Sequence, residues 1–327
     1  MVTLPTGKLP SDLLARLLAR APAGDARVVL GPGIGLDCAV VAQGDTLLVY
    51  KSDPITFATD EIGWYLVHVN ANDIATTGAT PRWLLVTALL PEGKTTAEDV
   101  ERIAEQVYAA CREIGVAVIG GHTEITHGLD RPILAGTLIG EVARERLVTP
   151  RGAVPGDRVL LTKGVPIEAT AILAREFPAR LAGALSAAEL GRARAFLHDP
   201  GISVLRDARV ALAAGRVTAM HDPTEGGLAG ALWELAEACG RALVVDPAAV
   251  PVPELSARIC RVFGLDPLAA IASGALLLTA PAADAPRVRR ALEADGIPCA
   301  EIGVVEEGPA GVNLPRPERD EIAKAWE

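Results

Sequence analysis

Apolar residues in the first half of the chain follow the periods of strands and of amphipathic helices. Between residues 61 and 77 they recur every three to four positions, which predicts a helix that Gly78 and Pro81 end. Helices are also predicted over residues 11–20 and 96–115. Short β-rich runs punctuated by glycine predict strands at 27–30, 39–42, 46–50, 83–90, 116–119 and 133–142. The alternation of the two periods predicts an α/β domain.

The second half of the chain mixes the same periods in a different order. Strand-like runs occur at 158–162, 242–245, 275–279 and 301–305. Helical patterns occupy residues 168–176, 187–196, 203–213, 228–239, 253–263 and 283–294. This arrangement predicts an α+β domain. The stretch RERLVTPRGAVPGD is rich in Arg, Pro and Gly and reads as a linker, so we place the domains at 1–150 and 151–327.

The charge and cysteine content of the chain indicate which binding partners and which cellular compartment to expect. A formal net charge of −10 over 327 residues argues against nucleic acid or an anionic membrane as the main partner, because both require a basic surface. Five cysteines without a C-x-x-C pair indicate neither a disulfide framework nor a zinc ribbon. We find no secretory signal and no apolar run of membrane-spanning length. We therefore expect a cytoplasmic protein.

The helix predicted over residues 61–77 contains the polar stretch HVNANDIATTGATP. Asn70, Asp73 and Thr77 fall on one helical stripe, displaced from the apolar one. A solvated face would explain them, but no Lys, Arg or Glu follows Glu61 on that helix. We therefore favour a polar face turned toward a ligand.

Acidic and amide side chains stand beside glycines where apolar runs end: Asp37, Asp53, Asn72, Asp73, Glu124 and Asp222. Mg²⁺ takes oxygen ligands and needs few carboxylates, because phosphate oxygens and water complete its octahedron. The sequence contains no P-loop, no Rossmann glycine fingerprint and no G-x-S-x-G elbow. The pattern favours a metal–nucleotide site of another kind.

Two glycine-rich segments suit close backbone approach to phosphates. Gly31, Gly33 and Gly35 could form an anion-binding nest, although a tight connection between strands would also explain them. Gly226 and Gly227 follow the motif DPTE, which has the spacing of a capping box. Capping leaves the two glycines unexplained, because each costs about 1 kcal/mol in a helix.

Lysines and histidines give a weaker signal. Lys51 and Lys163 stand at predicted strand ends, where they could balance phosphate charge or be ordinary surface lysines. The histidines show no zinc spacing, and His122 draws interest only as a neighbour of glycines and Glu124.

Taken in order, several segments resemble the aminoimidazole ribonucleotide (AIR) synthase superfamily, most closely its HypE-like, AIR-synthase-related branch. They are GPGIGLDCAVV, SDPITF, HVNANDIATTGATP, IGGHTEIT, PGDRVLLTKG, HDPTEGGLAGALWELAEA and IASGALLLTAP. The resemblance covers about residues 27–280 and implies a two-domain fold of α/β and α+β type. It implies a PurM-like N-terminal domain whose sheet pairs across a homodimer, and a PurM-like C-terminal α+β domain.

The resemblance further implies that ATP and Mg²⁺ bind, between the domains and across the dimer. The implied metal ligands are Asp37, Asp53, Asp73 and Asp222. The implied catalytic residues are Asp73, Asp222 and Glu124. The implied nucleotide-binding residues are Gly33, Gly35, Lys51, Asn72, Gly120, Gly121, His122, Thr123, Lys163, Gly226 and Gly227.

The chain departs from the family pattern at three places. Leu36 stands where paired acids are usual, and His122 replaces an acid, leaving Glu124 as a substitute. HypE proteins work through a C-terminal cysteine, whereas this sequence ends DEIAKAWE with no cysteine after Cys299. The sequence therefore supports the HypE-like scaffold better than HypE chemistry.

We expect a homodimeric, Mg²⁺-dependent enzyme that uses ATP to phosphorylate an oxygen of a small-molecule acceptor, with a maturation partner protein as another possible ligand. Two alternatives stay open. One is a non-catalytic, nucleotide-binding dimeric scaffold in metalloenzyme maturation. The other is a phosphotransferase that resembles the thiamine-monophosphate kinases.

Overall fold

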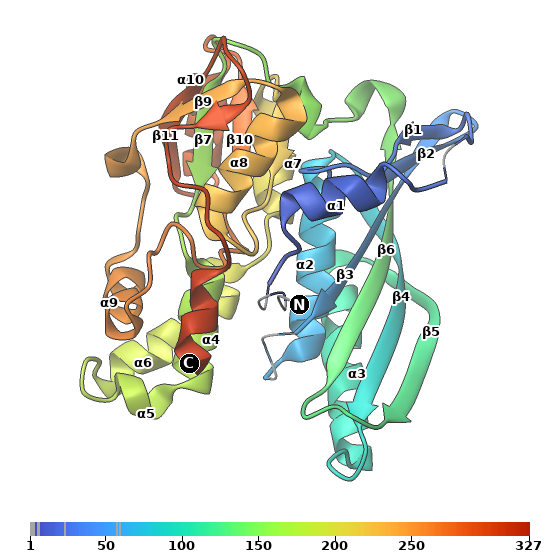
Figure 1. Cartoon of the computed structure of the whole chain (residues 1–327), viewed down its shortest axis with the longest axis vertical. Helices are drawn as coiled ribbons and strands as arrows, with labels where there is room; N and C mark the ends of the chain where they lie inside the picture. Colours follow the sequence, from blue (N-terminus) through green and yellow to red (C-terminus); the bar gives the residue numbers. More distant parts are fainter. Residues whose placement is uncertain (1–3, 5–6, 23, 57, 59) are drawn as a thin grey trace. The chain divides into compact units, whose positions relative to one another are not determined.

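The chain divides into two compact units, each described by itself (Figure 1). The computed structural model describes residues 4, 7–22, 24–56, 58 and 60–327, without the side chain of Ser11. The N-terminal unit comprises residues 25–31 and 37–147. The C-terminal unit comprises residues 148–327 together with the segment 32–36 and the described part of residues 1–24. The sequence-based ranges 1–150 and 151–327 stay predictions.

A six-stranded sheet forms the N-terminal unit, in the order β1-β2-β3-β6-β4-β5. Its strands are β1 (Val28–Leu30), β2 (Ala39–Gln43), β3 (Thr46–Ile55), β4 (Thr80–Pro91), β5 (Ala117–Thr126) and β6 (Ile133–Ala143). Only the pair of β4 and β5 is parallel among the described strands of this sheet. The helices are α2 (Ile62–Thr76) and α3 (Ala97–Ile114), and the 3₁₀ turn η1 (Arg144–Arg146) follows β6.

Helix α2 confirms the helix predicted over residues 61–77, and it lies very close to the sheet. Every residue of α2 except Trp64 is buried. Gly136 and Gly140 on β6 make this possible, since a Cβ there would lie 2.9 Å from Asn70 Nδ2 and 2.4 Å from Ile74 Cγ2. Its polar residues therefore lie in the interior of the unit, not on a solvated face.

Strand β5 extends further than the strand predicted at residues 116–119. It continues through Gly120 and Gly121 to Thr126, paired with β4. Gly121 has a φ of +148°, and a Cβ there would lie 1.8 Å from the carbonyl oxygen of Val86 on β4. The two glycines thus belong to a strand, where the close approach of two backbones requires at least Gly121.

The C-terminal unit holds a second six-stranded sheet, in the order β12-β9-β11-β7-β10-β8, antiparallel except where β12 meets β9. Its strands are β7 (Arg158–Thr162), β8 (Ala219–His221), β9 (Ala242–Val245), β10 (Leu277–Ala280), β11 (Cys299–Glu306) and β12 (Gly311–Val312). Its α-helices are α1 (Ser11–Leu18), α4 (Ile167–Glu176), α5 (Pro178–Leu181), α6 (Ala187–Ala195), α7 (Leu205–Ala214), α8 (Gly227–Cys239), α9 (Glu254–Phe263) and α10 (Ala285–Ala294). Short turns of 3₁₀ or π-helix complete it: η2 (Pro150–Gly152), η3 (Leu197–Gly201), η4 (Pro247–Ala249) and η5 (Glu321–Trp326).

Apolar side chains of α8 and of the strands make the core of the C-terminal unit. Leu228, Leu232 and Leu235 of α8 are fully buried with Leu161 of β7 and Leu277 of β10. The α/β plus α+β organisation expected from the sequence is confirmed. Within the described part of the chain, every helix falls short of the length and apolar character needed to cross a lipid bilayer.

Candidate functional site

The covered face of strand β3 changes from apolar to charged along its length. Side chains alternate across a strand, so Leu47, Val49, Lys51, Asp53 and Ile55 share one face. Leu47, Val49 and Ile55 are buried, and α2 packs against this strand. Lys51 and Asp53 therefore enter a mostly apolar layer between the sheet and α2, where charged groups need partners.

Lys51 forms ion pairs with two carboxylates in this layer. Its Nζ lies 3.1 Å from Asp73 Oδ1 on α2 and 3.3 Å from Asp53 Oδ2. The Asp73 side chain is 2% exposed and that of Lys51 is 14% exposed. Burial opposes the charged ammonium, but the carboxylates of Asp73, Asp53 and Asp37 outweigh it and raise the pKa of Lys51 well above its usual value. The acids around Lys51 thus favour its charged form.

Asn70 fixes the register between α2 and β3. Its Oδ1 accepts from the backbone N–H of Asp53 at 3.0 Å, and its Nδ2 donates to the Asp53 carbonyl at 3.3 Å and to the Leu66 carbonyl at 2.9 Å. Cys38 Sγ donates to the carbonyl of Asp73 at 3.3 Å. These bonds hold Asp53 and Asp73 in place on either side of Lys51.

We call Asp37, Asp53, Asp73 and Lys51 the N-terminal acid cluster. The chemistry of its donors suits a hard divalent cation, because three carboxylates supply oxygen ligands and a charge that attracts Mg²⁺. Asn72 is fully buried on the same helix as Asp73. The structure therefore brings together four predicted site residues in the N-terminal unit: Asp37, Asp53, Asp73 and Lys51.

The predicted residues of β5 lie apart from the acid cluster within one chain. Strands β6 and β4 separate β3 from β5, which is three strand spacings, or about 14 Å. His122, Thr123 and Glu124 are exposed on this edge strand, and His122 Nε2 lies 3.3 Å from Glu124 Oε2. A single N-terminal unit therefore does not unite Glu124 with Asp73.

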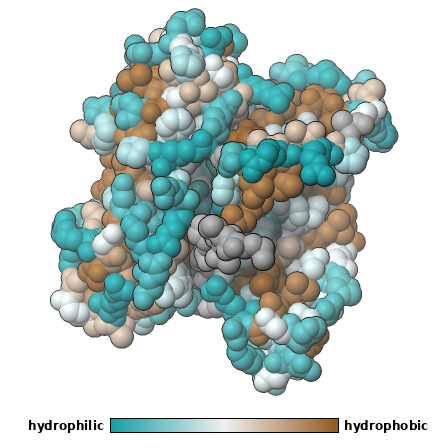
Figure 2. All heavy atoms as spheres, viewed as in Figure 1, coloured by the Kyte–Doolittle hydropathy of each residue, from teal (hydrophilic) through white to brown (hydrophobic). Residues whose placement is uncertain are grey.

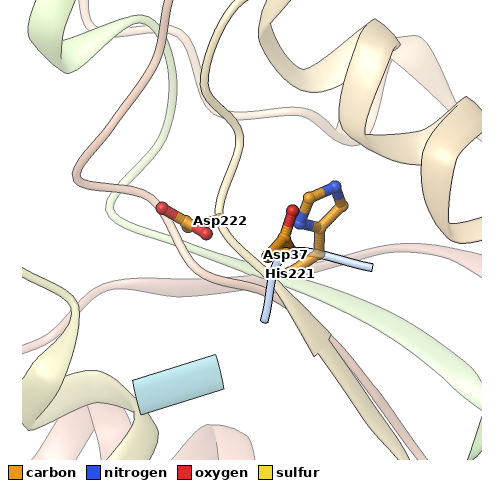
Figure 3. Close-up of side chains that lie close together, drawn as sticks. All are labelled: Asp37, His221 and Asp222. Atoms are coloured by element: carbon orange, nitrogen blue, oxygen red, sulfur yellow. The ribbon is translucent and has the colours of Figure 1, made fainter. Parts of the chain in front are cut away.

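In the C-terminal unit, the motif HDPTEGG begins at the end of β8. His221 and Asp222 are both 1% exposed, and their side chains leave the backbone in different directions (Figure 3). His221 Nε2 lies 2.9 Å from Glu234 Oε2 on α8, and Lys8 Nζ lies 3.1 Å from Glu234 Oε1. The predicted catalytic and metal-binding role of Asp222 stays a prediction.

The capping-box interpretation of DPTE is wrong. Helix α8 begins at Gly227, and its N-cap is Gly226 with a φ of +83° and no side-chain cap. The Gly226 N–H donates instead to Asp320 Oδ2 at 2.6 Å, and the Gly227 N–H donates to the Thr224 carbonyl at 2.9 Å. Gly227 also packs on the loop before β10, where a Cβ would lie 2.6 Å from the Ala270 carbonyl oxygen. Both glycines thus have structural reasons that capping could not supply.

Gly33 and Gly35 also have close neighbours within the C-terminal unit. Gly35 has a φ of +66°, and a Cβ there would lie 2.3 Å from the carbonyl oxygen of Glu234 on α8. A Cβ on Gly33 would lie 2.6 Å from Leu36 Cδ1. The predicted contact of these glycines with phosphate stays a prediction.

Lys163 lies in the interior of the C-terminal unit. Its Nζ donates to the Ser203 carbonyl at 2.6 Å and lies 3.3 Å from Asp207 Oδ2. Asp207 Oδ1 accepts from Thr162 Oγ1 at 2.6 Å. Burial lowers the pKa of Lys163, and Asp207 opposes that shift. Its predicted contact with phosphate stays a prediction, and the residue already has an internal carboxylate partner.

Sequence reasoning missed two buried acids behind the HDPTEGG motif. Burial raises the pKa of Glu168 to about 8, and Glu225 adds to the rise, while the hydrogen bond from the Ser273 N–H at 3.2 Å opposes it. Burial likewise raises the pKa of Asp320 to about 6, against three backbone N–H donors. No local sequence signal marks either acid. Glu168, for example, lies in the first turn of α4, where an acid is common on any helix.

Two family profiles together match most of the chain. The family profile "AIR synthase related protein, N-terminal domain" matches residues 35–142, and the profile of the corresponding C-terminal domain matches residues 154–313. The chain belongs to the AIR synthase related family. The HypE-like branch expected from the sequence is also confirmed by the relatives described next.

Among the relatives of this family member is the carbamoyl dehydratase HypE of Cupriavidus necator, 34% identical over 265 residues, which are 78% of this chain and 71% of that protein. A putative hydrogenase expression/formation protein of Methanocaldococcus jannaschii is 30% identical over 78% of this chain and 75% of its own length. A solved structure of the hydrogenase maturation protein HypE in complex with ATP is similar with a TM-score of 0.69, 27% identity, and coverage of 91% of this chain and 85% of that one.

Proposed function

We propose that this protein is a Mg²⁺-dependent, ATP-using enzyme of the HypE type, which transfers the γ-phosphoryl group to an oxygen of a small acceptor during hydrogenase maturation. The observation that carries the proposal is the N-terminal acid cluster, where Lys51 pairs with the carboxylates of Asp53 and Asp73 and also feels the charge of Asp37. Similarity to an ATP-bound HypE and to carbamoyl dehydratases supports the same conclusion.

The aspartates and the lysine of the cluster have different parts in this proposal. Asp37, Asp53 and Asp73 would hold Mg²⁺, and Asn72 would assist from α2. When bound, Mg²⁺ supplies charge neutralisation and orientation of the phosphates. Lys51 would contact phosphate oxygens, while the Asn70 bonds keep Asp53 and Asp73 in register. Such a site works by positioning and by electrostatics, without a nucleophilic side chain.

A second copy of the chain would complete the site. Glu124 and His122 lie about three strand spacings from the acid cluster in their own chain. The strand that carries them is at a sheet edge and exposed along nearly its whole length, with Val118, Ile119 and Ile125 among its exposed apolar residues. Apolar surface is visible over the strands of this unit (Figure 2). We propose that this sheet pairs in a homodimer, because exposed apolar edge strands are otherwise prone to aggregation.

The test of the proposal is turnover of Mg-ATP with and without Asp73. Asp73→Ala should abolish ATP-dependent turnover of the acceptor. Where no acceptor is present, it should abolish the slow release of ADP from ATP. Circular dichroism should show that the variant is folded. Asp130→Asn is the matched control, because Asp130 is a fully exposed carboxylate of the same unit. Near-normal turnover by Asp73→Ala would refute the proposal.

One observation favours a second candidate, the non-catalytic nucleotide-binding scaffold. Lys51 already neutralises part of the acid cluster, and an ammonium in that place could substitute for the metal needed in catalysis. A scaffold of this kind would bind ATP equally well with and without Mg²⁺ and would release no ADP. A maturation partner protein remains part of both proposals and would be sought by pull-down from the native host.

A further inference from the structure

The charge balance of the N-terminal acid cluster differs from that of a plain carboxylate site. Three aspartates contribute negative charge, and Lys51 adds one positive charge through its ion pairs with two of them. The ammonium contacts an oxygen of Asp53 and an oxygen of Asp73 at 3.3 Å and 3.1 Å. A divalent cation that used those oxygens would have to approach a positive charge a few ångströms away.

We infer that Lys51 is a gate for the metal: it holds Asp53 and Asp73 until a nucleotide arrives, and thereby makes tight binding of the divalent cation depend on the nucleotide. The inference rests on the proposed function. Lysine carries its charge on a flexible four-carbon stem, so the ammonium can turn from carboxylate to phosphate oxygens. Once the phosphates hold Lys51, the two carboxylates are released to the metal.

The surroundings of the cluster hold the backbone of Asp53 and the side chain of Asp73, which leaves the charged end of Lys51 to exchange partners. Asn70 bonds both the N–H and the carbonyl of Asp53. The Asp73 side chain is 2% exposed, on a helix that packs against the sheet. Lys51 has 14% of its side chain exposed and is held at its charged end by the two ion pairs. Asp53 and Asp73 therefore keep their positions on β3 and α2 while the lysine exchanges partners.

Charge repulsion sets the size of the expected effect. Two like charges about 5 Å apart repel even in water, and a dication doubles the interaction, so removing the ammonium should tighten metal binding at least about tenfold. The effect should be confined to the protein without nucleotide. In the ternary complex the same lysine faces phosphate and no longer opposes the metal.

The experiment counts bound Mn²⁺ by electron paramagnetic resonance, with Mn²⁺ replacing Mg²⁺ and a non-hydrolysable imido analogue of ATP as nucleotide. Wild type should bind Mn²⁺ weakly alone and at least about tenfold more tightly with the analogue. Lys51→Met should bind Mn²⁺ tightly without the analogue, and Lys51→Arg, which keeps the charge, should behave as wild type. Lys94→Met is the matched control, because Lys94 pairs with the exposed Asp130 in the same unit.

Two results would overturn the inference in distinguishable ways. In the first result, the analogue promotes Mn²⁺ binding in all of the proteins, but wild type and Lys51→Met bind Mn²⁺ equally well without nucleotide. The gate is then refuted and the proposed function stands. If the analogue brings Mn²⁺ to none of them, the proposed function fails and the gate with it. Melting temperatures establish the folding of each variant first, and Lys51→Gln replaces Lys51→Met if the latter does not fold.

Discussion

Removing Asp207 should destabilise the C-terminal unit more than an ordinary point substitution does. Asp207→Ala leaves Lys163 in the interior without its carboxylate and takes the acceptor from Thr162. The side chains of Lys163 and Asp207 are 7% and 2% exposed, so water does not replace the lost partner. Breaking a buried ion pair from one side costs about 3–5 kcal/mol. With a urea m-value of about 2.5 kcal/mol/M, the midpoint should fall by about 1–2 M.

The assay is urea unfolding followed by tryptophan fluorescence and circular dichroism. The double variant Lys163→Met/Asp207→Leu should recover most of the loss, because apolar replacement of a buried ion pair is close to neutral. A cost below about 1 kcal/mol for Asp207→Ala would mean that Lys163 does not depend on this carboxylate. In that case the ammonium of Lys163 would be solvated, and the phosphate contact predicted from the sequence would gain support.

Three further predictions concern two buried acids and one glycine of strand β5. Because the pKa of Glu168 is raised to about 8, its contribution to stability is full below about pH 4.5 and is lost as the pH rises through 8. The free energy of unfolding of Glu168→Gln, measured with urea, should therefore equal that of wild type at pH 4 and exceed it by up to about 5 kcal/mol at pH 9. Gly121→Ala should cost at least about 1–3 kcal/mol in thermal unfolding, since its Cβ would collide with Val86; an unchanged melting temperature would contradict this. Asp320→Asn should weaken hydrogen-exchange protection of the Gly226 amide by about 1–3 kcal/mol, and equal protection would contradict the bond between them.

Local sequence patterns predicted the elements of the N-terminal unit well. The apolar period over residues 61–77 located α2 to within one residue at each end. The alternation through Val49, Lys51 and Asp53 also contains the information that two charged side chains share the covered face of β3. Position in a strand or helix is a local property, so a single sequence can carry it.

The partners of those side chains could not be predicted in the same way. The ion pair of Lys51 with Asp73 depends on how α2 lies on the sheet, which the Asn70 amide and the missing side chain of Gly136 determine. Those contacts join elements far apart in the chain, and no spacing rule contains them. The polar helix face expected to meet a ligand thus meets β3 first.

The conformation of the HDPTEGG motif could not be predicted for a related reason. DPTE has the spacing of a capping box, but the acceptor for the Gly226 N–H comes from Asp320, 94 positions further along the chain. Glu168 and Asp207 stand in first turns of helices, where acids are favourable on any surface helix. Tertiary packing, not local pattern, buried both of them.

The proposed function requires the N-terminal acid cluster to bind a metal–nucleotide complex. Calorimetric titration measures this binding, with the imido analogue of ATP added to wild type and to Asp73→Asn, each with and without Mg²⁺. We expect one Mg²⁺-dependent binding event per chain in wild type and its loss in Asp73→Asn. Absence of binding in wild type, or binding that is the same without Mg²⁺ and in Asp73→Asn, would contradict the claim.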